Sequence, residues 1–262
     1  MTMSNRMVIL TACFVALSGC VSPRVDRYPT FFSQKQNFKS GKVLMDIVLI
    51  HDTMKDTDKV DLVLNKEIAR ELLPVVRDGL KAKGLPVGDA VLTAMGAAMG
   101  KHNSYKLVHN VFEQRLEYDQ LLSGRPPFFV DGSYESDSEH VRALSSVYKS
   151  LLLADVDTDA EHTVIQDATS LRGLEGASTL YVLFVGGYEV PPVTIMSEEL
   201  GSNRETVGRV KVQRITQASV TFFIVNTETG ELLWSDRRHV QGGTLNREKL
   251  LRMTLSILDG LP

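Results

Sequence analysis

Ser178–Val185 reads Ser-Thr-Leu-Tyr-Val-Leu-Phe-Val and carries the strongest signal for a buried strand in the chain. The run is eight residues long and is rich in β-branched and aromatic side chains. Such runs are typical of a strand that is covered on both faces. We therefore expect this segment to lie at the centre of a sheet, and we expect Gly186-Gly187 to form a tight turn after it.

Two further runs downstream predict a hairpin beside this strand. Ala218–Val225 (ASVTFFIV) is apolar and β-branched, and Glu231–Val240 (ELLWSDRRHV) alternates between apolar and polar residues. Asn226–Gly230 lies between them and supplies turn residues. An earlier run, Lys42–His51 (KVLMDIVLIH), predicts another buried strand. The sheet is therefore expected to hold strands from both ends of the chain.

Segments with the apolar spacing of a helix lie between and after these predicted strands in the sequence. Val60–Lys83 predicts a helix that ends at Gly84 and that Pro74 kinks or divides, and Leu245–Leu258 predicts a closing helix. Another helix is expected to begin at Ser136 or Ser138. The predicted fold class is α/β, with a mixed sheet, flanking helices, an antiparallel C-terminal hairpin and a closing helix.

The middle of the chain is expected to be an inserted helical segment, about residues 86–170. Within it, Val87–Met99 is dominated by small residues and is interpreted as a short helix or tight loop, and Glu113–Leu122 as a short helix. The whole body, residues 42–262, is predicted to be a single α/β domain.

The composition of the chain argues against several classes of function. The 262 residues are 43% hydrophobic and 23% charged, with a formal net charge of −3, which argues against a nucleic-acid binder that relies on a basic field. Both cysteines, Cys13 and Cys20, lie in the first twenty residues, so the body has no cysteine for a disulfide, a zinc site or a nucleophile.

The amino terminus has the pattern of an export signal. Arg6 precedes an apolar stretch of about eleven residues, too short to span a bilayer as a permanent helix. Leu17-Ser18-Gly19-Cys20 resembles the lipobox that lipoprotein signal peptidase cuts. This resemblance implies cleavage between Gly19 and Cys20 and acylation of Cys20 by chains such as palmitate. An ordinary secretory signal that contains Cys20 by chance is the alternative.

We accordingly predict residues 1–19 as a lipoprotein signal peptide and residues 20–41 as an acylated tether. Val21 follows the cysteine, where the Asp that often marks inner-membrane retention would stand. The expected location is therefore the bacterial outer membrane, with the protein held by Cys20 and its body in the periplasm.

The hairpin carries a further resemblance. Thr229-Gly230-Glu231-Leu232-Leu233-Trp234, following the strand Ser178–Val185, resembles a unit found in curli-secretion-channel lipoproteins, penicillin-binding-protein-activator lipoproteins and the amino-terminal domain of TolB. The likeness covers the opening strand and helix and roughly residues 178–258. It implies a non-enzymatic adaptor or assembly factor of an envelope complex, and it implies no catalytic residue.

Loops placed by a rigid scaffold commonly carry recognition. We therefore predict that a protein partner in the envelope contacts the Gly187–Leu200 loop and the hairpin tip, and that an oligomer forms in some settings. The residues expected at this contact are Tyr188, Pro191, Pro192, Glu228 and Thr229.

Two alternatives remain open from sequence. The small-residue segment 88–100 would serve an oligomeric pore-forming or secretion-channel lipoprotein, and His51 and Asp52 with an acid from residues 155–161 would serve an envelope hydrolase. No metal or cofactor is expected. The six histidines lack metal-ligand spacing, and residues 155–166 depart from a calcium loop at Ala160 and Gln166.

Overall fold

The computed structural model describes the chain in these ranges: 29–52, 58–60, 62–96, 105–109, 112–116, 138–153, 164–165, 168–189, 193–198, 207–212, 217–241 and 246–262. The strands are β1 (Gly41–Asp52), β2 (Asp58–Val60), β3 (Ala90–Thr93), β4 (Tyr105–His109), β5 (Phe112–Leu116), β6 (Thr179–Glu189), β7 (Val193–Glu198), β8 (Val207–Val212), β9 (Gln217–Asn226) and β10 (Leu232–Gln241). The helices are α1 (Pro29–Gln34), the 3₁₀ turn η2 (Lys35–Asn37), α2 (Leu62–Ala82), α4 (Ser138–Leu153), α5 (Ala168–Glu175) and α6 (Arg247–Asp259).

Eight of the described strands form one mixed sheet. Its order is β10-β9-β6-β1-β2-β4-β5, with β3 beside β1. β6 pairs in parallel with β1 over Thr179–Glu189 and antiparallel with β9 on its other side. The expectation that Ser178–Val185 forms the centre of the sheet is confirmed, and so is the hairpin of β9 and β10.

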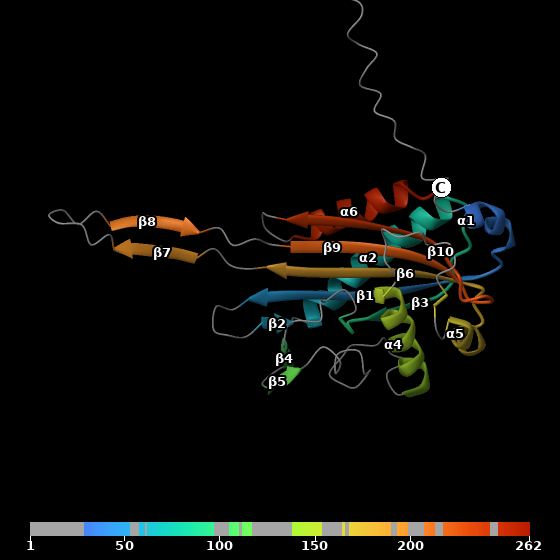
Figure 1. The fold of residues 1–262 in the computed structure, drawn as a ribbon, viewed down its shortest axis with the longest axis horizontal. Coiled ribbons are helices and arrows are strands. Elements are labelled where there is room, and N and C mark those ends of the chain that lie inside the picture. The colour runs from blue at the N-terminus through green and yellow to red at the C-terminus, as the bar shows by residue number, and fades with distance from the viewer. Residues whose placement is uncertain are drawn as a thin grey trace, which may run out of the picture.

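Helices cover both faces of this sheet (Figure 1). α2 and α6 pack on one face, and α4 lies on the other with α5 beside it. The core lies on both faces of the sheet. Trp234 packs against Phe222 on the face that α2 and α6 cover, and Tyr148 of α4 packs against Phe184 on the other face. The predicted α/β class with flanking helices and a closing helix is therefore confirmed.

α2 continues as one helix through Pro74, so of the two outcomes expected at this proline, a kink or a division, the division does not occur. The exposed proline removes one backbone donor, whereas Leu72, Val76 and Leu80 bury the opposite stripe in the core. Gly84 ends the helix as predicted, with φ of +72°. Packing of the apolar stripe outweighs the loss of one hydrogen bond.

The middle of the chain differs most from the prediction. Val87–Met99 was expected as a short helix or tight loop, but Ala90–Thr93 forms β3 in parallel with Val43–Asp46 of β1. Part of the helix predicted at Glu113–Leu122 is instead strand β5, paired with β4. The inserted segment of about 86–170 therefore contributes strands to the sheet as well as α4. Sheet edges satisfy backbone groups over long sequence separations, which local propensity does not report.

The chain joins the folded body before the predicted end of the tether. Within residues 20–41, α1 and η2 occupy Pro29–Asn37, and Phe31 in α1 is fully buried. Gln34 and Lys35 bond to Asn226 and to the carbonyl oxygen of Pro262. The described part of the predicted tether thus packs on the body through an aromatic side chain. The predicted signal peptide and Cys20 lie outside the described residues.

Candidate functional site

The predicted partner-binding residues fall at two different places. Tyr188 lies near the end of β6, in register with Gln217 of β9. From this end of the sheet the hairpin of β7 and β8 projects beyond the rest of the body (Figure 1). We call β7 and β8 the arm. Pro191 and Pro192 belong to the connection into the arm and lie outside the described residues.

The expected Gly187–Leu200 loop is therefore wrong as secondary structure, as is the tight turn at Gly186-Gly187. β6 continues through both glycines to Glu189, and Val193–Glu198 forms β7. The glycines pair with β1 on one side and with β9 on the other. Backbone hydrogen bonds on two sides hold them in the strand, although glycine has no intrinsic preference for it.

The hairpin tip lies at the opposite end of the sheet. Asn226 closes the turn, because its side-chain oxygen accepts from the backbone N–H of Glu228 at 2.8 Å. Glu228 and Thr229, two of the residues predicted to contact a partner, are exposed at this tip. Asn226 pairs with Thr179, nine residues along β9 from Gln217. At about 3.4 Å per residue, the tip and the arm end lie about 30 Å apart, so the predicted contacts form two surfaces.

The N-terminal segment packs beside the hairpin tip. Gln34 of α1 accepts from Asn226 Nδ2 at 2.8 Å and donates to Glu231 Oε2 at 3.3 Å. Residues 21–28 separate Cys20 from α1, and a chain of eight residues spans at most about 28 Å. An anchor at Cys20 would therefore hold the tip end of the sheet near the membrane.

A cavity of about 220 Å³ lies between α4 and the outer strands of the sheet. Its lining comes from α4, β6, β9 and β10: Leu151, Leu152, Phe184, Ser219, Thr221, Phe223, Arg237 and His239. Leu151 and the two phenylalanines are buried and form the floor, whereas the arginine and the histidine are exposed at the rim. The cavity therefore combines an apolar floor with a cationic rim. We call it the rim-charged cavity.

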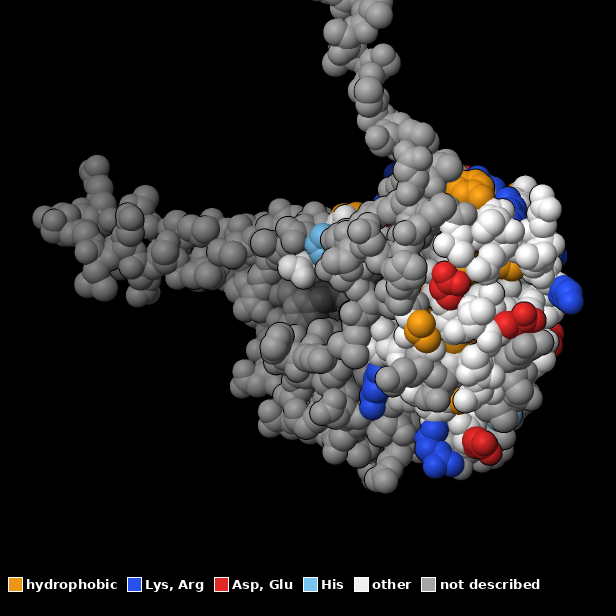
Figure 2. Space-filling view, turned by 45° about the vertical axis from the view of Figure 1, so that its right-hand side comes forward, with side chains coloured by type: hydrophobic (Ala, Val, Ile, Leu, Met, Phe, Trp, Pro, Cys, Tyr) orange, Lys and Arg blue, Asp and Glu red, His pale blue; other side chains and the backbone are white. Residues whose placement is uncertain are grey.

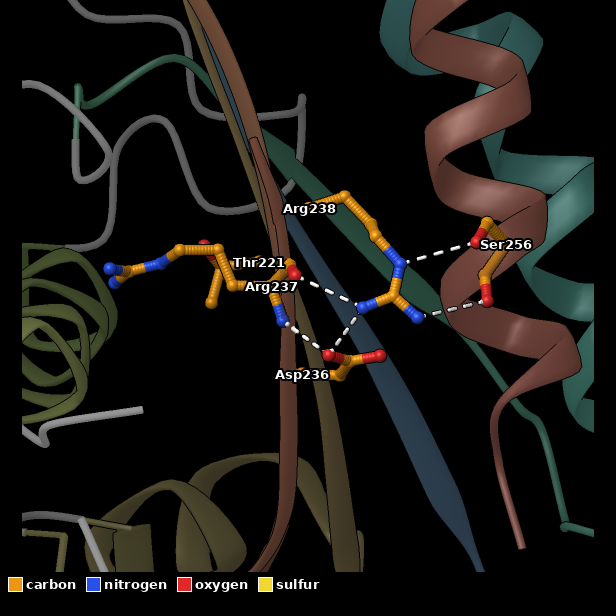
Figure 3. A network of polar contacts seen from close by, with 5 residues as sticks. All are labelled: Thr221, Asp236, Arg237, Arg238 and Ser256. Carbon is orange, nitrogen blue, oxygen red and sulfur yellow. Dashed lines mark hydrogen bonds and ion pairs between the residues drawn. The ribbon is translucent and has the colours of Figure 1, made fainter. Parts of the chain in front are cut away.

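The sequence Asp236-Arg237-Arg238 places its side chains on alternate faces of β10 (Figure 3). Arg238 points toward α6, where its guanidinium donates to Asp236 Oδ1 at 2.6 Å and to Ser256 Oγ at 3.2 Å. Arg237 points the other way, toward α4, and its Nε donates to Thr221 Oγ1 at 3.3 Å. One arginine is thus fixed in an ion pair, and its neighbour lines the cavity.

A buried carboxyl group lies on the same face as the rim-charged cavity. Asp46 of β1 is 1% exposed and accepts from Thr93 Oγ1 at 2.7 Å and from the backbone N–H of Met95 at 2.5 Å. The Thr93 hydroxyl also lies 3.1 Å from the Tyr148 hydroxyl. This cluster joins β1, β3 and α4, so its evident role is to hold α4 on the sheet.

The residues of the hydrolase hypothesis are not brought together in the described structure. His51 and Asp52 lie at the end of β1, in register with Lys59 and Asp58 of β2, and residues 155–161 lie outside the described ranges. Across the described residues, no cluster of three or more histidine, cysteine or acidic side chains is suited to a metal ion. None of the helices in the described ranges has the length and apolarity needed to cross a bilayer.

The described surface shows charges of both signs. On the face drawn in Figure 2, lysine, arginine and acidic side chains alternate over the described body, and hydrophobic side chains appear as small separate areas. On that face, the described part of the chain presents no large patch of a single sign.

No protein-family model matches this sequence, and no curated protein matches it. Among solved structures, it is similar to a Helicobacter pylori homolog of neuraminyllactose-binding hemagglutinin, at 10% identity and a TM-score of 0.33, over 85% of this chain and 83% of that chain. It is also similar to a lipoprotein from Neisseria meningitidis, at 13% identity and a TM-score of 0.30, over 84% of this chain and 95% of that one. One neighbour is thus a bacterial lipoprotein, but both scores are too low for either likeness to carry an argument.

Proposed function

We propose that this protein is a non-enzymatic adaptor or assembly factor of the bacterial envelope, anchored to the outer membrane by acylated Cys20. One observation carries the proposal: the segment that leads to Cys20 and the projecting arm lie at opposite ends of one sheet. A body held at one end and extended at the other suits a protein that bridges a membrane and a partner.

The anchor is tested by the mass of the mature protein. We expect a first residue at Cys20 that carries diacylglycerol and an amide-linked acyl chain, and we expect the protein in the membrane fraction. Cys20→Ala removes the only thiol in the predicted lipobox and should release the protein from the membrane, whereas Cys13→Ala should not. A mature protein with an unmodified thiol at Cys20 would contradict the anchor.

The arm is tested by a shortened hairpin. Residues 190–215 are replaced by Asn-Gly, so that Glu189 and residue 216 flank a two-residue turn that matches the pairing of Tyr188 with Gln217. We expect the body to unfold cooperatively with unchanged stability and to lose crosslinks to its envelope partner. The matched control places Ser at both Glu228 and Thr229, at the other end of the sheet.

Site-specific photo-crosslinking in cells distinguishes the two ends. A photoreactive residue at Met196 in β7 should crosslink to a protein partner, and one at Thr229 should crosslink mainly to lipid or to proteins at the membrane surface. The shortened-arm protein lacks Met196, so it is compared with the unaltered protein by a chemical crosslinker, and equal recovery of the partner from both would refute the role of the arm. The anchor and the arm can therefore fail separately.

A further inference from the structure

We propose that the rim-charged cavity binds a small carboxylate with an apolar tail. The proposal is independent of the adaptor function. The cavity lies on the face of the sheet that α4 covers, whereas the adaptor function depends on the two ends of the sheet. It begins from Arg237, which lies on the wall of the cavity and pairs with no acid in the part of the chain that the structure describes.

Arg237 has unused hydrogen-bonding capacity. Among the described residues, its side chain makes one hydrogen bond, from Nε to the Thr221 hydroxyl, and its two terminal nitrogens find no acceptor. The nearest acid in sequence, Asp236, points to the opposite face and pairs with Arg238 (Figure 3). A guanidinium presents a planar fork of donors that matches a carboxylate in two parallel hydrogen bonds.

The hydroxyl groups beside Arg237 extend this donor set. Thr221 and Ser219 lie on alternate positions of β9, in register with Arg237 and His239 of β10. Thr221 is 5% exposed and already accepts from Arg237, so its own hydroxyl hydrogen is available as a donor toward the cavity. His239 adds a further nitrogen at the rim.

The floor fits an apolar tail. Phe184 and Phe223 pack edge to face with ring centroids 5.5 Å apart, and Phe184 packs in the same way on Tyr148 at 5.1 Å. Leu151 of α4 is fully buried on the other side. The floor is thus already packed without a ligand, and we expect binding to require little rearrangement of it. The register also places Gly186 beside Ser219, which leaves this part of the sheet surface without a side chain.

The volume sets the size of the tail. A cavity of about 220 Å³ equals the liquid volume of about seven water molecules. Drug-sized ligands require about 300 Å³ or more, so the ligand is smaller than these. A branched tail of five carbons beyond the carboxylate, which matches the Cα and the four side-chain carbons of leucine, fits within this volume.

The charge favours a carboxylate over a phosphate. Arg237 is the one permanently charged side chain in the lining. A single guanidinium balances one negative charge, whereas a phosphate monoester carries nearly two. Two sources supply the required chemistry: a free branched-chain carboxylic acid, and the C-terminal residue of a peptide that ends in leucine.

The test is a titration followed by NMR on the chain from residue 20 onward carrying Cys20→Ala, so that the apolar stretch of the predicted signal peptide and the acyl chains are both absent. The probes are 4-methylpentanoate, its alcohol with the same tail, acetate with the same head group, and acetyl-Gly-Leu as the free acid and as the amide. The amide signals of Thr221, Arg237 and His239 report binding. A range up to about 10 mM detects dissociation constants in the millimolar region.

We expect 4-methylpentanoate to shift these signals with saturation, and we expect acetate and the alcohol to bind at least about tenfold more weakly. Arg237→Gln should weaken binding about tenfold or more, Thr221→Val should weaken it less, and Ser219→Leu should block the cavity. Arg252→Gln is the matched control, because Arg252 is an exposed arginine on α6, on the other face of the sheet, and should leave binding unchanged.

The two sources are separated by the peptides. Stronger binding of acetyl-Gly-Leu acid than of its amide and of 4-methylpentanoate assigns the site to a peptide C-terminus, and the reverse order assigns it to a free acid. Absence of saturable shifts with either carboxylate overturns the proposal, as does binding that Arg237→Gln leaves unchanged while the variant unfolds at the wild-type denaturant concentration. Arg237→Lys keeps the charge without the planar fork, and should restore only part of the affinity.

Discussion

Phe31→Ala tests whether the chain just after the proposed anchor belongs to the folded body. Phe31 is fully buried, and its ring lies edge to face with Phe38, with centroids 6.0 Å apart. Loss of a buried aromatic ring removes about 2–3 kcal/mol of transfer free energy, and the cavity left behind brings the total to about 3–5 kcal/mol. Domains are stabilised by about 5–15 kcal/mol in total, so this change is large.

The matched control is the next residue. Phe32 is 38% exposed, so Phe32→Ala removes a ring of the same size that is only partly buried. We expect Phe32→Ala to cost less than about 1.5 kcal/mol. The pair separates burial of the ring from any general effect of removing an aromatic residue from α1.

The assay is urea unfolding of the Cys20→Ala chain, followed by the fluorescence of the single tryptophan. Trp234 is fully buried in β10, against which α1 packs. With an m-value of about 2.5 kcal/mol/M, a loss of 3–5 kcal/mol lowers the midpoint by about 1–2 M urea. If Phe31→Ala and Phe32→Ala gave the same midpoint as the unaltered chain, α1 would belong to the tether and the structural argument for the membrane end would fail.

Three further substitutions test the packing and the buried polar groups by the same unfolding assay. Gly41→Ala places a Cβ against the carbonyl oxygen of Pro86 and the Tyr181 ring, and should cost about 3 kcal/mol, whereas Gly84→Ala, which meets no atom, should cost about 1 kcal/mol. Tyr181→Phe removes a buried hydroxyl that has no hydrogen-bond partner, so stability at pH 7 should hold or rise by about 1 kcal/mol. Burial raises the pKa of Tyr181 above its usual value of 10. The stability that depends on its protonated hydroxyl is therefore fully present below pH 10 and is lost as the pH rises further. A series of unfolding measurements above pH 10 should show a smaller loss of stability in the phenylalanine variant than in the unaltered chain. Asp46→Ala leaves two buried donors without their acceptor and should cost about 2–4 kcal/mol, measured against Asp89→Ala at an exposed position.

The parts of the fold that the sequence predicted are those with a local cause. Ser178–Val185 and the hairpin of Ala218–Val240 have β-branched composition, alternation and an Asn-to-Gly turn, each of which acts within a few residues. The helix over Leu62–Ala82 follows from its own apolar spacing. Local patterns of this kind survive folding because the tertiary contacts agree with them.

The parts that the sequence did not predict have a distant cause. Ala90–Thr93 is a strand because it pairs with an edge of β1. Its first residue, Ala90, pairs with Val43, which lies 47 residues earlier in the sequence. Gly186 and Gly187 remain in β6 because strands on both sides pair with them. In each case, hydrogen bonds to a partner far along the chain overrule what the residues would favour alone.

The rim-charged cavity was missed for the same reason. Arg237 and Arg238 are identical neighbours in sequence, and only their alternation across β10 gives one an ion pair with Asp236 and the other a cavity wall. Leu151 and Leu152 reach the same cavity from a helix more than 80 residues upstream. The two arginines inside the otherwise buried strand were the sequence feature that could have indicated the cavity. The sequence shows that they lie in this strand, but it does not show which arginine faces α4 and which faces α6.

The strand register shows why Asp46 does not pair with Arg237 at the cavity. Asp46, Phe184, Thr221 and Arg237 occupy one row across β1, β6, β9 and β10. Three strand spacings of about 4.8 Å separate the acid from the arginine, about 14 Å in all, and the Phe184 ring stands between them. Asp46 and Arg237 are therefore too far apart to form an ion pair with each other. Asp46 accepts hydrogen bonds from Thr93 and from the Met95 backbone, whereas the side chain of Arg237 bonds, among the described residues, to the Thr221 hydroxyl alone. Because no described acid pairs with Arg237 in the way that Asp236 pairs with Arg238, the carboxylate titration is the decisive measurement on this face.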